Sequence, residues 1–314
     1  MRARWALAIL LSSAVLIAAP LLGSSLGGPR GDFLLWQLRV PRVLMGVLVG
    51  GTLSLSGAVF QLVLENPLAT PDTVGTTAGA TLGALVALVL GGFTPLSGFP
   101  VIAPAAFAGA LAVSLLVGAV ASSGRARIND VLLAGVAAAL GASALATGLE
   151  YWAGMNAVFA ASRWSLGHLP QMGYRGVVLV APAALASWAV LLASWRALRA
   201  LTLGQELAHS QGVDVPRLRT WLLGTASLAV AACVAWCGPI AFVGLVVPHL
   251  VRLSLGRTVR VLLLGSLLMG ASFLVACDTL ARLALPGREL PVGVLTAALG
   301  APTLLWLVLG QRRA

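Results

Sequence analysis

Residues that could carry out chemistry are few in this sequence and stand far apart. Its 314 residues include nine acids, three histidines and three cysteines, and all 20 basic residues are arginines. His168, His209 and His249 are too scattered for a metal cluster or for a paired nucleophile and base. Without lysine, the chain also lacks a P-loop phosphate lysine and a Schiff-base lysine. These features argue against an enzyme.

The cysteines and His168 each have a structural and a chemical interpretation. Cys233, Cys237 and Cys277 lie within apolar segments, and the first two are four residues apart rather than in a Cys-x-x-Cys pair. We expect them to be small core residues, with a metal or redox site as the alternative. For His168, which lies near Trp164, haem ligation is the alternative to a structural role.

The polar stretch 196–219 is the strongest candidate for recognition of another protein. Gly204 and Gly212 bracket a short segment that can form a helix. Asp214 and Pro216 then suit the start of a second short helix. Two short helices within the longest charged loop indicate a docking surface for a soluble partner. A solvated connector is the alternative.

Composition places these polar residues in a membrane protein. The chain is 59% hydrophobic and 9% charged, whereas a soluble domain carries roughly 25% charged residues. The formal net charge of +11 comes from arginines between apolar runs. Membrane topology explains this distribution better than binding to nucleic acid does.

Ten apolar segments approach the length of about 20 residues that a spanning helix needs. The first resembles a signal peptide, but the many segments that follow indicate a retained helix. We expect an all-α integral membrane protein that forms one domain over residues 1–314, with about ten transmembrane helices. The predicted spans are 5–23, 43–63, 74–91, 100–120, 131–151, 176–195, 219–236, 240–254, 260–277 and 291–310.

Charge distribution predicts the orientation of these spans. An even number of spans leaves both termini on one side, and arginines are more frequent on that side. Positive charge marks the cytoplasmic side, so we expect both termini and the 196–219 loop in the cytoplasm. Arg39, Arg42 and Arg282 would then face the other compartment.

The acids and a repeated pattern bear on the type of transport. No acid is predicted in the middle of a span, and Asp278 and Glu289 would lie at a span end or in a loop. An ion-driven carrier needs an intramembrane carboxylate, so a secondary transporter is the less favoured alternative. Residues 74–91 and 292–310 share Val-Gly, Leu-Gly-Ala and Leu-Val-Leu-Gly steps, which predicts an inverted repeat.

Four stretches resemble a known family when taken with the Gly204–Gly212 spacing. They are Arg39-Val40-Pro41-Arg42, Asn66-Pro67-Leu68-Ala69-Thr70-Pro71, the run from Gly238 to His249, and Glu289-Leu290-Pro291-Val292-Gly293, which leads to Pro302. Their order and sequences closely resemble the permease subunits of ABC importers for iron–siderophore complexes, haem and cobalamin.

The resemblance implies a homodimer of ten-helix subunits in the bacterial cytoplasmic (inner) membrane. Two ATPase subunits would dock on the cytoplasmic side and carry the ATP and magnesium. A substrate-binding protein would dock on the outer side. This chain would itself hold no cofactor or metal. The implied cargo is an iron–siderophore or haem, with cobalamin as the alternative.

The resemblance also implies roles for individual residues. The 196–219 stretch would be the coupling loop, which docks on the ATPase. Four of its residues match the family pattern, namely Gly204, Glu206, Ala208 and Gly212, whereas Gln205, Leu207, His209 and Gln211 depart from it. We expect ATPase coupling at Gly204, Gln205, Glu206, Ala208, His209 and Gly212, docking of the binding protein at Arg39, Arg42 and Arg282, and a cytoplasmic gate at Asn66 and Leu68. The alternatives are interfacial arginines that anchor helix ends and a simple Asn-Pro turn.

Overall fold

A computed structural model shows a helical protein over residues 2–22, 31–90, 101–121, 128–170, 173–284 and 289–311, which are the residues the structure describes. No strand occurs among them. Six helices are long and apolar enough to cross a membrane, and four shorter apolar helices accompany them. The prediction of an all-α membrane protein with about ten spans is confirmed.

In chain order the elements are α1 (Arg2–Ala18), α2 (Gly31–Phe33), the π-helix η1 (Leu34–Arg39), α3 (Val40–Val63), the 3-10 helix η2 (Pro71–Val74), α4 (Thr76–Leu90), α5 (Ile102–Ala121), α6 (Ile128–Trp152), α7 (Met155–Ser165), α8 (Arg175–Ala193), α9 (Trp195–Leu201), α10 (Gln205–Ser210), α11 (Val215–Cys237), α12 (Val243–Ser254), α13 (Val259–Leu283) and α14 (Val292–Gln311).

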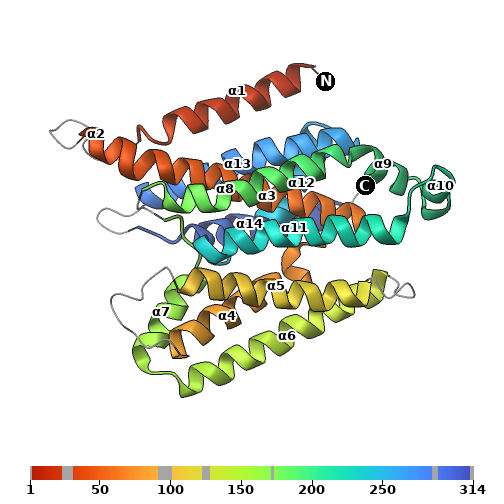
Figure 1. Cartoon of the computed structure of the whole chain (residues 1–314). Coiled ribbons are helices and arrows are strands. Elements are labelled where there is room, and N and C mark those ends of the chain that lie inside the picture. Colours follow the sequence, from red (N-terminus) through yellow and green to blue (C-terminus); the bar gives the residue numbers. More distant parts are fainter. Residues whose placement is uncertain are drawn as a thin grey trace.

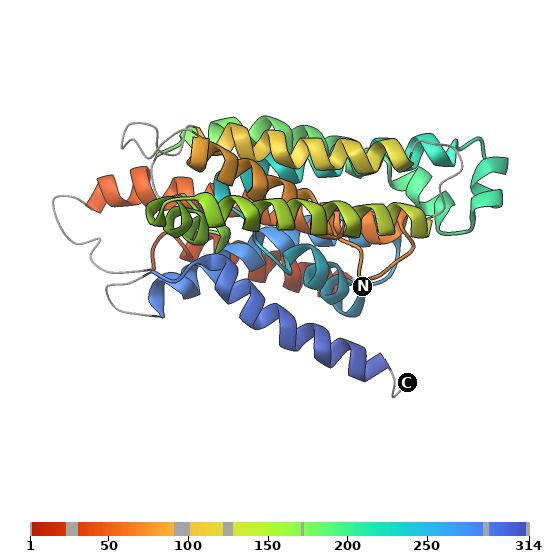
Figure 2. The ribbon, with the colours of Figure 1, turned by 90° about the horizontal axis from the view of Figure 1, so that it is seen from below.

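The helices form two groups that α11 joins. Helices α4, α5 and α6 pack on one another, and α7 covers one end of α4 (Figure 1). On the other side, α3 packs against α8, α12 and α13, while α1 lies along α13. Helix α11 contacts both α5 and α3. Helix α14 diverges from the bundle toward its C-terminal end (Figure 2).

Both ends of the chain lie at the same end of the bundle. Helix α1 begins, and α14 ends, toward the side where α9 and α10 lie (Figures 1 and 2). Helix α2 and the C-terminal end of α13 lie at the opposite side (Figure 1). This is the arrangement that an even number of spans predicts. We refer below to the α10 end and to the α2 end.

The second helical span begins much earlier than the predicted residue 43. It is continuous from Gly31, so the Arg39–Arg42 motif lies inside a helix and not before one. Pro41 has no N–H group to donate to the carbonyl of Gln37, four residues earlier. The backbone N–H of Gly173 donates to that carbonyl instead, at 3.1 Å. A proline that would interrupt the helix thus becomes a contact with the loop before α8.

The eighth span, predicted at 240–254, is the short helix α12, and Pro248 lies inside it and not at its end. Pro248 likewise leaves the carbonyl of Gly244 without an intrahelical donor. The side-chain amide of Gln61, on α3, donates to that oxygen at 3.3 Å. In both cases a backbone acceptor freed by proline is satisfied by another segment, as a membrane interior requires.

Small residues allow α3 to contact its neighbours through the backbone. A Cβ atom at Gly50 would overlap the backbone of Gly270 on α13, and one at Gly57 would overlap the backbone of Gly244 on α12. Such close approach is typical of packing between membrane helices, and the glycines of the second span predicted it. Helix α3 is accordingly the most deeply buried of the long apolar helices.

We predict that Gly57→Ala lowers the thermal unfolding midpoint in detergent by several degrees, because the added methyl group meets the backbone of Gly244. Gly141→Ala, in the middle of α6, is the matched control, since a Cβ there meets no atom within 4 Å. The control should be neutral or slightly stabilising, as alanine favours helix by roughly 1 kcal/mol over glycine. Equal midpoints for the two variants would contradict the close contact.

Candidate functional site

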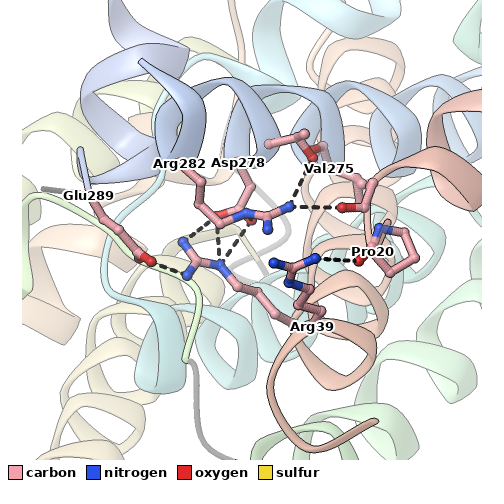
Figure 3. Close-up of polar contacts among 9 residues, drawn as sticks. Pro20, Arg39, Val275, Asp278, Arg282 and Glu289 are labelled. Atoms are coloured by element: carbon pink, nitrogen blue, oxygen red, sulfur yellow. Dashed lines mark hydrogen bonds and ion pairs between the residues drawn. The ribbon is translucent and has the colours of Figure 1, made fainter. Parts of the chain in front are cut away.

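An arginine cluster at the α2 end is organised around Arg42. The Nε and Nη2 atoms of Arg42 donate to the carboxylate of Asp278 at 2.8–3.0 Å, and Nη1 donates to Oε2 of Glu289 at 2.8 Å (Figure 3). The side chains of Arg42 and Asp278 are only 8% and 4% exposed, whereas that of Glu289 is 46% exposed. This ion-pair cluster joins α3, α13 and the segment before α14.

Two further arginines extend the cluster to the end of α1. Arg282, four residues after Asp278 on α13, lies 3.3 Å from its carboxylate and donates to the carbonyl of Ala19 at 3.1 Å. Arg39 donates to the carbonyl of Pro20 at 3.2 Å (Figure 3). The structure thus brings together all three arginines that the sequence analysis selected for docking.

The location of two members of this cluster differs from the sequence prediction. The predicted span ended at 277, but α13 continues to Leu283, so Asp278 lies within the helix and is buried. Arg42, expected to face outward, is also buried. A buried carboxylate is tolerated when cations compensate it, and Arg42 and Arg282 do so here. A buried acid in a span therefore exists, but it is held in ion pairs.

At the α10 end, the coupling loop consists of α9, α10 and their connections. Gly204 and Gly212 have positive φ angles of 114° and 80°, which suit glycine. After α10, the N–H of Gly212 donates to the carbonyl of His209, and the N–H of Val213 to that of Ala208. This is the Schellman arrangement that ends a helix with glycine. The predicted short helix between the two glycines is confirmed.

The second short helix is α9, and it precedes α10 rather than following it. Asp214 does cap a helix, since its side chain accepts the N–H of Arg217 at 3.2 Å. However, that helix is α11, which continues without a break to Cys237. The coupling loop is therefore joined rigidly to the helix that contacts both groups of the bundle.

The coupling loop has a buried face and an exposed face. Ala208 is fully buried and packs in a small apolar cluster with Leu201 and Val215. Two apolar side chains, Leu203 and Leu207, are exposed instead. The sequence analysis missed these leucines, although leucine within a charged segment is the available signal. The other predicted coupling residues, Gly204, Gln205, Glu206, His209 and Gly212, are exposed.

The predicted gate residues lie in a defined turn after α3. The Oδ1 atom of Asn66 accepts the N–H of Leu68 at 2.9 Å, and its carbonyl accepts the N–H of Ala69 at 3.0 Å. Leu68 is exposed. Asn66 therefore forms the turn that was the alternative to gating, and this turn presents Leu68 away from its own subunit.

Within the described residues, no group of three or more His, Cys, Asp or Glu side chains could hold a metal ion. The three cysteines are buried and not disulfide-bonded. The backbone N–H of His168 donates to the backbone carbonyl of Cys237 at 2.7 Å. Burial, with smaller contributions from Arg42 and Arg163, lowers the pKa of the His168 imidazole.

The ten apolar helices, the ordered loop at one end and the arginine cluster at the other are the architecture of a polytopic membrane transport subunit. The chain matches the model of the FecCD transport family over residues 5–310. It therefore belongs to that family, and it is the permease subunit of an ABC importer. Family membership implies partner ATPases and a binding protein.

Relatives and a solved structure agree with this assignment. The chain is 40% identical to the cobalamin import system permease protein BtuC of Halobacterium salinarum, over 93% of this chain and 77% of that protein. It is 37% identical to the hemin transport system permease protein HmuU of Yersinia pestis, over 88% and 83%. A metal-chelate type ABC transporter in an inward-facing conformation has a TM-score of 0.84 at 27% identity, covering 96% of this chain and 98% of that one.

We predict that Asp278→Asn lowers the free energy of unfolding by about 3–5 kcal/mol, because it leaves buried arginines without a compensating charge. Glu289→Gln is the matched control at the exposed partner of the same arginine and should cost no more than about 1 kcal/mol. Denaturant unfolding of the purified protein measures both. A loss for Asp278→Asn no larger than that of the control would contradict the cluster.

We also predict a loss of stability below pH 6.5 that depends on His168. Because its pKa is lowered in the folded state, the unfolded chain takes up a proton first as the pH falls from about 6.5. The stabilising contribution is complete above that pH and is lost below it. Thermal midpoints between pH 5 and 8 should fall less steeply for His168→Gln than for the unchanged chain. The same slope for His168→Gln and for the unchanged chain would contradict this prediction.

Proposed function

We propose that this permease imports a large metal chelate, either an iron–siderophore or haem, with cobalamin as the alternative cargo. The observation that carries the proposal is the similarity to permeases whose names specify hemin and cobalamin, with a structural neighbour described as a metal-chelate type transporter. These cargos share a metal ion enclosed by a bulky organic ligand. The cobalamin alternative is favoured by two of the relatives, including the vitamin B12 import system permease protein BtuC of Escherichia coli, 39% identical over 91% of this chain and 86% of that protein.

In the proposed assembly, two copies of the chain form a single pathway in the bacterial cytoplasmic membrane. Leu305, Trp306 and Leu309 on the diverging part of α14 are exposed and available to a second copy (Figure 2). The α10 end and both termini face the cytoplasm. Two ATPase subunits, which bind the ATP and magnesium, dock there, and their closure alternates the access of the pathway. The permease itself makes and breaks no bond.

The α2 end would receive the substrate-binding protein. The cluster carries a net positive charge, because its three arginines, Arg39, Arg42 and Arg282, outnumber its two carboxylates by one. Guanidinium groups pair well with carboxylates of a partner and set its orientation. Since Arg42 is buried, its docking role is to hold the cluster in place and to offer Nη1, where a partner carboxylate would compete with the half-exposed Glu289.

The coupling loop would engage the ATPase through its exposed leucines. Leu203 and Leu207 lie on the exposed face of the loop, whereas Ala208 packs on its buried face in the cluster with Leu201 and Val215. An apolar anchor within a polar rim is the usual composition of a protein interface. The rigid connection from this loop into α11 would carry the movement of the ATPase into the bundle.

Uptake by proteoliposomes that contain this chain, its cognate ATPase and its binding protein tests the proposal. We expect ATP-dependent accumulation of one member of a panel of haem, ferric siderophores and cobalamin. Uptake that proceeds without ATP and collapses with an ion gradient would instead identify a secondary transporter. Accumulation of cobalamin alone would select the alternative cargo.

Two variants of Leu207 test whether this side chain contributes to association with the ATPase. Leu207→Gln should reduce ATPase association and uptake together by about tenfold, the size expected of one interface anchor. Leu207→Met keeps an apolar side chain of similar volume and should behave as the unchanged chain. Full association of the Leu207→Gln variant would remove this leucine from the interface.

A further inference from the structure

An ion pair joins the start of α11, just after the coupling loop, to the residue before Asn66 in the gate turn, across 154 residues of sequence. An Nη2 atom of Arg219, on the second turn of α11, donates to Oε1 of Glu65 at 3.2 Å. Glu65 directly precedes Asn66, which forms the gate turn. Arg219 follows by five residues the capping Asp214 that ends the coupling loop. The two segments assigned to coupling and gating therefore touch through one pair of side chains.

The backbone at Glu65 has to be held in place. Its φ angle is +48°, and within the described residues only Phe242 shares a positive φ among those that are not glycine. A left-handed conformation costs a residue with a side chain roughly 1–2 kcal/mol, so it persists where surrounding contacts favour it. The contact with Arg219 is one that acts directly on Glu65.

The arginine is the anchored member of the pair. Its side chain is 17% exposed, against 52% for Glu65. The Nε atom of Arg219 is buried and has no hydrogen-bond partner in the part of the chain that the structure describes. Removing Glu65 would leave a largely buried guanidinium with less compensation. Arg219 is part of α11, so a displacement of α11 also moves its guanidinium group, with which Glu65 is paired.

A second contact holds the same end of α3 from another side. Nη1 of Arg252, on α12, donates to Oε1 of Gln61 at 2.6 Å. Gln61 in turn donates to the Gly244 carbonyl, so this contact fixes the end of α3 to α12. Beyond Gln61, the chain turns at Glu65, where the contact is with α11 instead. The gate turn thus follows two side-chain contacts, one from Gln61 near the end of α3 to α12 and one from Glu65 to α11.

We propose that the Arg219–Glu65 pair is a positioning contact through which movement of the coupling loop reaches the gate turn at 65–68. This inference rests on the proposed function, since it takes α9–α10 as the ATPase site and Leu68 as the gate. Reversal of one charge is expected to cost some stability at the largely buried Arg219 as well as to move the turn. The double reversal, which restores opposite charges, distinguishes these two effects.

Charge reversal of each partner and of both together tests the contact. Glu65→Arg and Arg219→Glu should each lower ATP-dependent uptake by about tenfold, within the usual range of coupling between sites. The double variant Glu65→Arg/Arg219→Glu restores opposite charges and should recover most of the uptake. ATPase association should be unchanged in all three.

Arg217→Glu is the matched control for charge at this position. Arg217 lies two residues before Arg219 on the same helix and forms an exposed ion pair with Asp214. We expect uptake and ATPase association at the level of the unchanged chain. Loss of ATPase association in Arg219→Glu but not in Arg217→Glu would place Arg219 in the interface and overturn the proposal.

The position of the gate turn can be read without any cargo. Leu68→Cys is labelled by a membrane-impermeant maleimide, and the three native cysteines are buried and give the background. ATP should change the labelling rate in the parent and in the double variant, but not in either single reversal. The same ATP response in every variant would overturn the proposal. Because no transport is needed, failure of the cargo assignment would not affect this result.

Discussion

Direct backbone contact between α3 and two neighbouring helices is the constraint on which the rest of the structure depends. Gly50 meets Gly270 on α13, and Gly57 meets Gly244 on α12, so α3 can neither slide nor rotate without a steric clash. This fixed register lets Arg42 reach Asp278 at one end of α3 and Gln61 reach the Gly244 carbonyl near the other. The polar contacts are short because the glycines set the distance.

Much of the fold follows from the sequence because the membrane imposes simple rules. The lengths of the apolar segments predicted the spans. Two glycines within a polar segment predicted α10, because the free backbone groups at a helix end need hydrogen-bond partners. The errors lie where tertiary contacts replace local ones. Apolar length predicted a span from residue 43, but the helix begins at Gly31 and continues through Pro41, where a donor from Gly173 satisfies the freed carbonyl. Nothing near Pro41 in the sequence reveals that donor.

The functional sites divide in the same way. Glycine spacing predicted the short helix α10, and the three arginines proposed for docking do converge at one end of the bundle. Their partners could not be read from the sequence, because Asp278 lies 236 residues from Arg42. The exposed Leu207 was likewise missed, since a leucine in an amphipathic segment is expected to be buried and only the packing of Ala208 determines which face is free.

Ion pairs of the described residues connect helices and loop segments to one another. Asp278, the buried acid within a span, is held in ion pairs with Arg42 and Arg282 at the α2 end, so its charge is compensated. The remaining ionic contacts described here lie near helix ends, where they join one segment to another. Charge in this subunit therefore holds helices together and links them. Under the proposed function, the energy for movement enters from the ATPase, and α11, which is continuous from Val215 to Cys237 and contacts both groups of the bundle, is the element placed to receive it.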